Sequence, residues 1–170
     1  MRKYYSILIA PFVLFVFASL AAAKPPSWDT KINGAGRFKV LSQFNNEAVL
    51  DKETGLVWEQ SPSTSTFTWF TAQIHCNQLT VGGRLGWRVP TIQELATLVD
   101  PNNPGGNPDL PPGHPFNNVQ SSFYWSATTN ALNTSRALDV FFGTGVVDID
   151  DKGHLIFVWC VRGGQGVDPQ

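Results

Sequence analysis

The chain is 170 residues long, 15% of its residues are charged, and it contains six tryptophans. This composition is typical of a packed domain and argues against a disordered chain. The 12 Lys and Arg residues against 13 Asp and Glu residues give a net charge of −1. Because affinity for nucleic acid depends mainly on neutralising phosphates, this balance argues against a nucleic-acid partner.

Residues 1–23 have the pattern of a secretory signal peptide. A basic start precedes an apolar stretch over 7–20, and the alanines at 21–23 form a small-residue cleavage site. The apolar stretch is short for a membrane span and is interrupted by Pro11, so an uncleaved N-terminal anchor is the lesser alternative to a cleaved signal. We therefore expect an exported protein, periplasmic or extracellular, that does not span a membrane after cleavage. Its mature chain would begin at Lys24 and carry ten basic against thirteen acidic residues, a net charge of −3.

The mature chain is expected to form a single domain. Residues 24–36 contain prolines and glycines without periodicity and predict a flexible leader, the domain is expected over 37–163, and 164–170 form a tail. Strand-like apolar segments predict a β-hairpin over 48–59. Its connection, Lys52-Glu53-Thr54-Gly55, ends in glycine, as is typical of a four-residue loop built on a type I turn.

Two helices are predicted in the middle of the domain. The first covers roughly 69–79, after Thr68 as its N-cap. Its buried stripe has helical spacing and consists of Trp69, Ala72, Cys76 and Leu79. The second begins at a capping box formed by Thr91 and Glu94 and ends before Pro101.

The segment 100–118 interrupts this pattern, because it holds six of the 12 prolines and five asparagines. A loop of this length inside a domain is more often a functional element than a simple connector. Asparagine suits sugar hydroxyls because its amide both donates and accepts hydrogen bonds. The candidate binding residues are therefore Asn102, Asn103, Asn107, Asp109, Asn117 and Asn118, with Arg136 as a contact for anionic groups.

Strand patterns follow the loop. Apolar runs predict an antiparallel meander of four strands over 123–128, 137–142, 146–149 and 155–161. The last two connections are tight turns, predicted at 143–145 and 150–153. Because strands and helices are segregated along the chain rather than alternating, the fold class is α+β.

The two cysteines lie in different predicted elements, Cys76 in the first helix and Cys160 in the last strand. Disulfides persist in exported proteins, and a bond between these two would close a loop of 84 residues. Closing such a loop stabilises a fold by ~4–5 kcal/mol in the chain-entropy model. A thiol held in a disulfide is not a nucleophile, so the bond would also remove Cys76, beside His75, as a catalytic candidate.

Three segments are distinctive in their order: Thr54-Gly55-Leu56-Val57-Trp58, Gly86-Trp87-Arg88-Val89-Pro90-Thr91-Ile92-Gln93-Glu94-Leu95 and Trp159-Cys160-Val161-Arg162. With them, the chain resembles the Lcl C-terminal-domain family of bacterial exported domains, from about Arg37 to Arg162. The resemblance implies a C-type-lectin-like fold, similar to that of sulfatase-modifying factors, with two helices packed on a twisted antiparallel sheet and long loops as the ligand surface. It also implies a disulfide between Cys76 and Cys160, glycosaminoglycan binding and a trimeric state.

Two features of this chain depart from the founding adhesin of that family. The chain has no collagen-like Gly-X-Y segment to drive trimerisation, and its negative net charge is the wrong sign for a general binder of sulfated glycans. The Trp-Arg-Val-Pro-Thr signature is interpreted as structural, with Arg88 pairing with a carboxylate under the long loop. Five tryptophans that lie in strand or helix patterns are expected in the core, namely Trp58, Trp69, Trp87, Trp125 and Trp159.

The remaining polar residues do not form a motif for a metal or a reaction. Clustered acids such as Asp148, Asp150 and Asp151 attract hard cations, but EF-hand spacing is absent and a solvated strand edge with a turn is the favoured interpretation. The three histidines are too scattered for a zinc motif: His75, His114 and His154. We therefore expect no metal, no cofactor and no catalytic residue, and hence no enzyme.

The leading hypothesis is an exported, disulfide-clamped binding module. It would recognise a carbohydrate or a cell-surface polymer, as an adhesin does, through 100–118 and neighbouring loops held on a rigid scaffold. The alternative is a structural or assembly protein of the cell envelope, in which the same loop contacts another protein and no small ligand exists.

Overall fold

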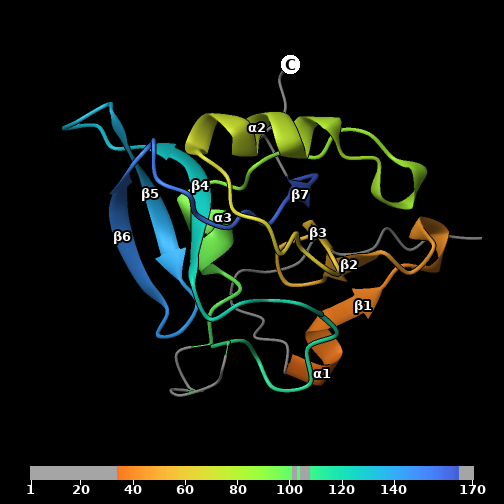
Figure 1. Ribbon diagram of the computed structural model, residues 1–170. Helices are drawn as coiled ribbons and strands as arrows, with labels where there is room; N and C mark the ends of the chain where they lie inside the picture. Colours follow the sequence, from red (N-terminus) through yellow and green to blue (C-terminus); the bar gives the residue numbers. More distant parts are fainter. Residues whose placement is uncertain (1–33, 101–102, 104–107, 165–170) are drawn as a thin grey trace, which may run out of the picture.

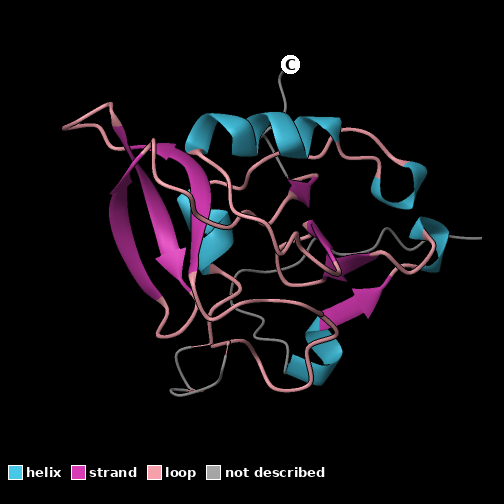
Figure 2. Cartoon of the chain, viewed as in Figure 1, coloured by secondary structure: helices cyan, strands magenta, loops and turns pink. Residues whose placement is uncertain are grey.

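The computed structural model describes residues 34–100, 103 and 108–164. The predicted signal peptide, most of the leader and all but the first residue of the tail lie outside the described residues. The described chain is α+β, with a four-stranded and a three-stranded antiparallel sheet. The α-helices are α1 (Gly34–Arg37), α2 (Trp69–Gln78) and α3 (Ile92–Ala96). Figures 1 and 2 show α2 running across one end of the molecule, above both sheets.

The first sheet has the strand order β1-β2-β3-β7. Its strands are β1 (Phe38–Val40), β2 (Ala48–Asp51), β3 (Val57–Glu59) and β7 (Val161–Arg162). β2 and β3 form the predicted hairpin, in which Val49 pairs with Trp58. Gly55 ends the turn with a φ of 75°, which glycine adopts without the steric cost that a Cβ brings.

A buried ion pair fixes the start of the domain onto this hairpin. Arg37 is the last residue of α1. Its Nε and Nη2 donate to the two carboxylate oxygens of Asp51 at 2.9 and 2.6 Å. Nη2 also donates to the carbonyl oxygen of Thr97, so one guanidinium joins α1, the hairpin and the end of α3. Such fork-to-carboxylate geometry is the strongest form of ion pair that arginine makes.

The second sheet is a meander with the order β4-β5-β6, whose strands are β4 (Phe123–Thr129), β5 (Arg136–Phe141) and β6 (Val146–Asp151). These three strands match the first three of the predicted meander. β6 extends into the first two residues of the turn predicted at 150–153, because Asp150 pairs with Ala137 and Asp151 with Arg136. β6 is an edge strand, and Figure 1 shows it at the outer side of the molecule.

The fourth predicted strand, 155–161, was wrong as part of that meander. This segment crosses from the second sheet to the first: Phe157 forms a single bridge with Tyr124 of β4, and Ile156 forms one with Phe67, in the loop before α2. Its last residue, Val161, begins β7 (Val161–Arg162), which pairs with β3. The physical reason is burial on both sides: Val158, Trp159, Cys160 and Val161 are all inaccessible to solvent, so the segment lies between elements rather than on one face.

Both predicted helices are confirmed, together with their caps. Thr68 accepts a hydrogen bond from the backbone N–H of Thr71 at the start of α2. The capping box of α3 is complete, with the Thr91 hydroxyl accepting from the Glu94 N–H and the Glu94 carboxylate accepting from the Thr91 N–H. α3 is shorter than predicted and ends at Ala96. Within the described residues, no helix has the length and apolarity that crossing a membrane requires.

The core consists of two buried clusters. Trp58 and Trp159 pack edge to face in the first, beside α3, at a centroid distance of 5.8 Å. Trp87 and Trp125 belong to the second, beside α2. Of the five tryptophans predicted in the core, these four are at most 1% exposed. The fifth, Trp69, is partly exposed, and its indole N–H donates to the carbonyl oxygen of Ser126.

Candidate functional site

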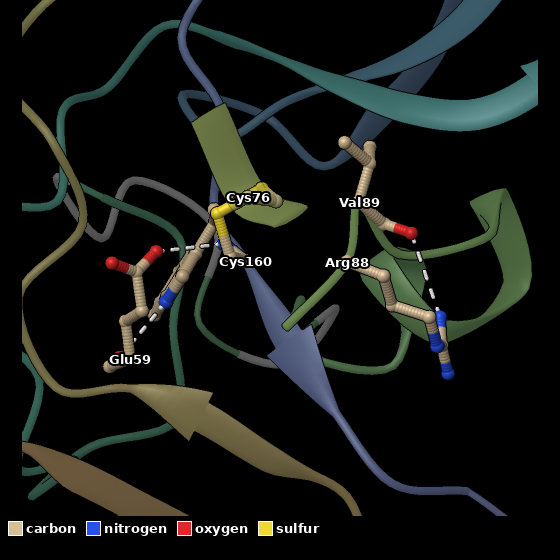
Figure 3. Close-up of a disulfide and its surroundings, with 6 residues drawn as sticks. Glu59, Cys76, Arg88, Val89 and Cys160 are labelled. Atoms are coloured by element: carbon tan, nitrogen blue, oxygen red, sulfur yellow. Dashed lines mark hydrogen bonds between the residues drawn. A yellow bond between two sulfur atoms is a disulfide. The ribbon is translucent and has the colours of Figure 1, made fainter. Parts of the chain in front are cut away.

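The disulfide between Cys76 and Cys160 joins α2 to the segment that enters β7 (Figure 3). Both sulfurs belong to fully buried residues, and no other cysteine exists in the chain. The predicted pairing is confirmed. The bond closes a loop that contains α3 and the whole second sheet, so it clamps the two ends of the domain's larger half together.

A carboxyl group lies against this disulfide. Glu59 Oε2 accepts a hydrogen bond from the backbone N–H of Cys160 at 2.8 Å, and its carbonyl oxygen accepts one from Trp159 Nε1. Burial raises the pKa of the Glu59 carboxyl to about 7, against the smaller opposing effect of the Cys160 hydrogen bond. Figure 3 shows Glu59 and Arg88 on either side of the segment that carries Cys160.

The Trp-Arg-Val-Pro-Thr signature has a structural role, as predicted, but with a different partner. Arg88 donates to both carboxylate oxygens of Glu94 at 2.7 Å, and a second hydrogen bond from Nη2 reaches the carbonyl oxygen of Gly163. The carboxylate therefore belongs to the signature itself and not to a residue under the long loop. Burial opposes ionisation of Glu94, but its hydrogen bonds with Arg88 and Thr91 lower its pKa overall.

The described part of the long loop is held on the framework by backbone hydrogen bonds. Asp109 N–H donates to Phe142 at the end of the second sheet, and Asn117 N–H donates to Gln60 after β3, at 2.7 and 2.8 Å. Gln60 Nε2 also donates to the carbonyl oxygen of Pro115. The loop is thus fixed at both of its described ends, and residues between these anchors are presented from a rigid support.

Asn117 and Asn118 are the predicted contact residues that lie exposed on this support. Asn118 has a φ of 57°, a left-handed conformation that asparagine tolerates better than most residues. Its Nδ2 donates to Ser61 Oγ at 2.8 Å, and its carbonyl oxygen accepts from Gln120 Nε2. Ser61 and Gln120 were not predicted, since only the folded loop brings them beside the asparagines.

The other predicted contact residues do not join this group. Asn103 is half-buried, and its Nδ2 donates to the carbonyl oxygen of Leu110. Asp109 is 3% exposed, and its pKa is raised by burial and by the charge of Asp100. Asn102 and Asn107 lie outside the described residues.

Arg136 is also distant from the asparagines. It begins β5, whereas the loop contacts the sheet next to the opposite end of that strand, at Phe142. Five residue steps along a strand separate Arg136 from Phe141, which is about 16 Å. The structure therefore does not combine the predicted anion contact with the predicted sugar contacts in one site.

An acidic face on the second sheet was not predicted as a unit. Asp139 on β5 pairs with Asp148 on β6, and Asp150 lies two residues further along the same face. Asp139 is fully buried, and neither of its carboxylate oxygens has a hydrogen-bond partner. Burial and the charges of Asp150 and Asp148 raise its pKa to about 7. This acidic face can be recognised only from the register that pairs β5 with β6, and apolar periodicity in the sequence does not give that register.

Histidines and acids do not assemble into a metal centre in the part of the chain that is described. His75 stacks on Phe67 and His114 on Phe116, at centroid distances of 4.5 and 5.9 Å. His154 Nδ1 lies 2.7 Å from Asp150 Oδ1. Each histidine thus has a separate local role.

Comparison with known proteins places the chain in a family. A search of the curated proteins found no match. The protein-family model of the Lcl C-terminal domain matches residues 47–162, which span the chain from β2 to the last residue of β7. The chain therefore belongs to the Lcl C-terminal domain family.

Proposed function

We propose that this protein is an exported binding module that recognises a carbohydrate or a cell-surface polymer, in the manner of an adhesin. The observation that supports it best is the pair of exposed amides, Asn117 and Asn118, on a loop fixed by main-chain hydrogen bonds to the residues that follow β3 and β5. Binding residues on loops with a rigid support keep their geometry without an ordering cost on binding. A C-type-lectin-like assignment of the α+β fold belongs to the same proposal.

The chemistry of this loop surface suits neutral sugar hydroxyls. The described side chains there are amides and a hydroxyl: Asn117, Asn118, Gln120 and Ser61. Amides both donate and accept, so a single asparagine can pair with two adjacent hydroxyls of a sugar ring. His114, half-buried and stacked on Phe116, adds a ring next to the polar group. None of these side chains is a cation, which is why neutral glycans are favoured over sulfated ones.

Export and the binding site are tested by separate experiments. Intact mass of the protein recovered from culture medium and periplasm, before and after reduction and alkylation, should give an N-terminus at Lys24 and thiols only after reduction. A mature chain that retains residues 1–23, or that stays in the cytoplasm, contradicts the export part of the proposal.

The binding site is tested on an array of bacterial and host surface glycans. Asn117→Ala and Asn118→Gly should each weaken the wild-type signal by ~5-fold or more, since each removes an amide from a buried contact. Glycine at 118 keeps the left-handed backbone available, so the second variant separates recognition from folding. Asn77→Ala, on the exposed side of α2, is the matched control and should leave the signal unchanged. An array that stays blank for the wild type, or equal signals for all variants, overturns the proposal.

A further inference from the structure

The outer strand of the second sheet, β6, carries acidic side chains that have no lysine or arginine partner among the described residues. Asp148 is exposed and Asp150 is partly exposed, and they lie on one face of the strand. Among the described residues, no Lys or Arg forms an ion pair with either. Asp150 pairs with His154, which is charged only when protonated.

Nearby cations are directed elsewhere. Lys152 follows the strand directly, but its ammonium lies 3.9 Å from the centre of the Trp69 ring and donates to Thr129 Oγ1 at 2.8 Å. Arg136 lies opposite Asp151, on the other face of the sheet from Asp148 and Asp150. The face is therefore acidic, and the described part of the chain supplies no lysine or arginine to it.

A second observation points to a ligand for this face. Asp139 is fully buried beneath it, in register with Asp148, and both of its oxygens lack a hydrogen-bond partner. A buried carboxyl without a partner destabilises a fold unless it stays protonated or a cation compensates it. The charges that act on it, those of Asp150 and Asp148, are both of the same sign. The fold thus retains three carboxyl groups on one face, which a positive group from outside would stabilise.

The strand also has apolar side chains at the spacing of an extended peptide. Val147 and Ile149 lie on the face opposite the acids and are 46% and 42% exposed. Val146 lies on the same face as the acids and is 55% exposed. Asp148 and Asp150 are two residues apart, about 7 Å along the strand, which is also the spacing of alternate side chains in a partner strand. An extended segment with alternating basic and apolar residues complements both properties.

We propose that β6 is a docking surface for a basic, extended segment of a partner protein, whose lysine or arginine side chains pair with Asp148 and Asp150. Binding would depend on side-chain ion pairs more than on main-chain hydrogen bonds to β6. The N–H of Ile149 already donates to Asp148 Oδ1, and the carbonyl oxygen of Asp151 accepts from His154. A second copy of the same strand is disfavoured, because three acids on each strand would repel one another.

This surface is independent of the proposed glycan site. It uses no residue of the 100–118 loop. A blank glycan array would therefore not contradict the proposal for β6, and failure of the peptide to bind β6 would not contradict the glycan site. In a chain with two such surfaces, the loop and the strand would bind different partners.

The test uses the full mature chain and a synthetic peptide of alternating lysine and valine, acetylated and amidated, in calorimetry at pH 8 and low salt. The control is the same peptide with glutamate in place of each lysine, and it should not bind. Asp148→Asn and Asp150→Asn should each weaken binding by ~5-fold or more, and added salt should weaken it further. Asp151→Asn removes the same charge from the opposite face and keeps an oxygen for the Gly153 N–H, so it should stay within twofold of wild type.

The role of Asp139 is tested by the pH dependence of the same binding. A cation on this face favours the ionised carboxyl, so affinity should rise from pH 6 to pH 8. Asp139→Asn should flatten that rise, whereas His154→Gln, the other titratable group facing Asp150, should retain most of it. Thermal unfolding of each variant checks that the fold is kept.

Three results would overturn the proposal. The first is the same affinity for the lysine and glutamate peptides, or no binding at millimolar concentration. The second is an equal loss of affinity for the lysine peptide in Asp148→Asn and in Asp151→Asn. The third is binding of calcium or of an amino-sugar oligomer that depends on Asp148 while the lysine peptide does not bind.

Discussion

The carboxyl of Glu59 accepts a hydrogen bond from the backbone N–H of Cys160, one of the two disulfide cysteines, at 2.8 Å. This contact joins the end of the first hairpin to the disulfide in the interior of the domain. Glu59 is 4% exposed, and its pKa is about 7 rather than the usual 4.5. A group that is shifted in this way makes the stability of the fold depend on pH near neutrality.

Glu59 should make the protein more stable in mild acid than in mild alkali. Its folded-state pKa lies above its unfolded value, so its contribution is fully present below pH 4.5 and is lost as the pH rises through about 7. The size of the loss is of the order of 3 kcal/mol. Glu59→Gln keeps an acceptor for Cys160 and removes the charge, so guanidinium unfolding of this variant should depend less on pH between 5 and 8. The pKa of Asp139 is raised in the same way, so the stability of the double variant Glu59→Gln with Asp139→Asn should depend least on pH. A variant that keeps the wild-type slope contradicts the assignment.

Removing the disulfide should destabilise the domain strongly. Cys76 and Cys160 are 84 residues apart in the sequence, and both are fully buried. The chain-entropy model gives about 4–5 kcal/mol for a loop of that size. Cys76→Ala with Cys160→Ala should show this loss in denaturant midpoint, and wild type under reducing conditions should approach the same value. Midpoints that do not differ would show that the framework holds without the bond.

The Arg88 fork should not be replaceable by a lysine. Its guanidinium makes two hydrogen bonds to Glu94 and one to the Gly163 carbonyl. Lysine keeps the charge but not the planar fork, so Arg88→Lys should cost about 1–2 kcal/mol of unfolding free energy. The exposed Arg84, near the ring of Phe44, is the matched control, and Arg84→Lys should cost less than half as much. Similar costs for both variants would contradict the structural role of the signature.

Gly82 should tolerate alanine less well than Gly55 does. Both have positive φ, 61° and 75°, so the backbone strain of an added Cβ is comparable. At Gly82 a Cβ would also lie 2.6 Å from the Phe44 Cα, which is backbone and cannot move away, whereas at Gly55 nothing lies within 4 Å. Gly55→Ala should cost about 1 kcal/mol and Gly82→Ala clearly more, measured by thermal unfolding. Equal costs would show that the 3-10 helix η2 (Val81–Gly83), which contains Gly82, is not packed on Phe44.

Local features of the fold were predictable because the residues that cause them are adjacent in sequence. Thr68, Thr91 with Glu94, and Gly55 determine a cap, a capping box and a turn through contacts of a few residues. The disulfide was predictable for another reason, since only two cysteines exist. The meander of three strands followed from apolar runs and tight turns.

Features that depend on distant pairing were not predictable. The segment 155–161 reads as a strand of the second sheet, yet its burial on both sides and its pairing with β3 come from elements about a hundred residues earlier. The same holds for the site. Asparagine content identified the loop, but which asparagines are exposed depends on where Gln60 and Phe142 anchor it. The acidic face needed the register of β5 with β6.

The position of the disulfide across the chain has a consequence for protease resistance. A single cut of the backbone anywhere between Cys76 and Cys160, and therefore anywhere in the 100–118 loop, leaves the two fragments covalently joined. Each fragment would also keep strands of the first sheet, because β1 to β3 precede the cut and β7 follows it. A nicked molecule would therefore migrate as one species without reductant and separate into two with it. A nick in this loop would therefore leave the domain as one covalent molecule.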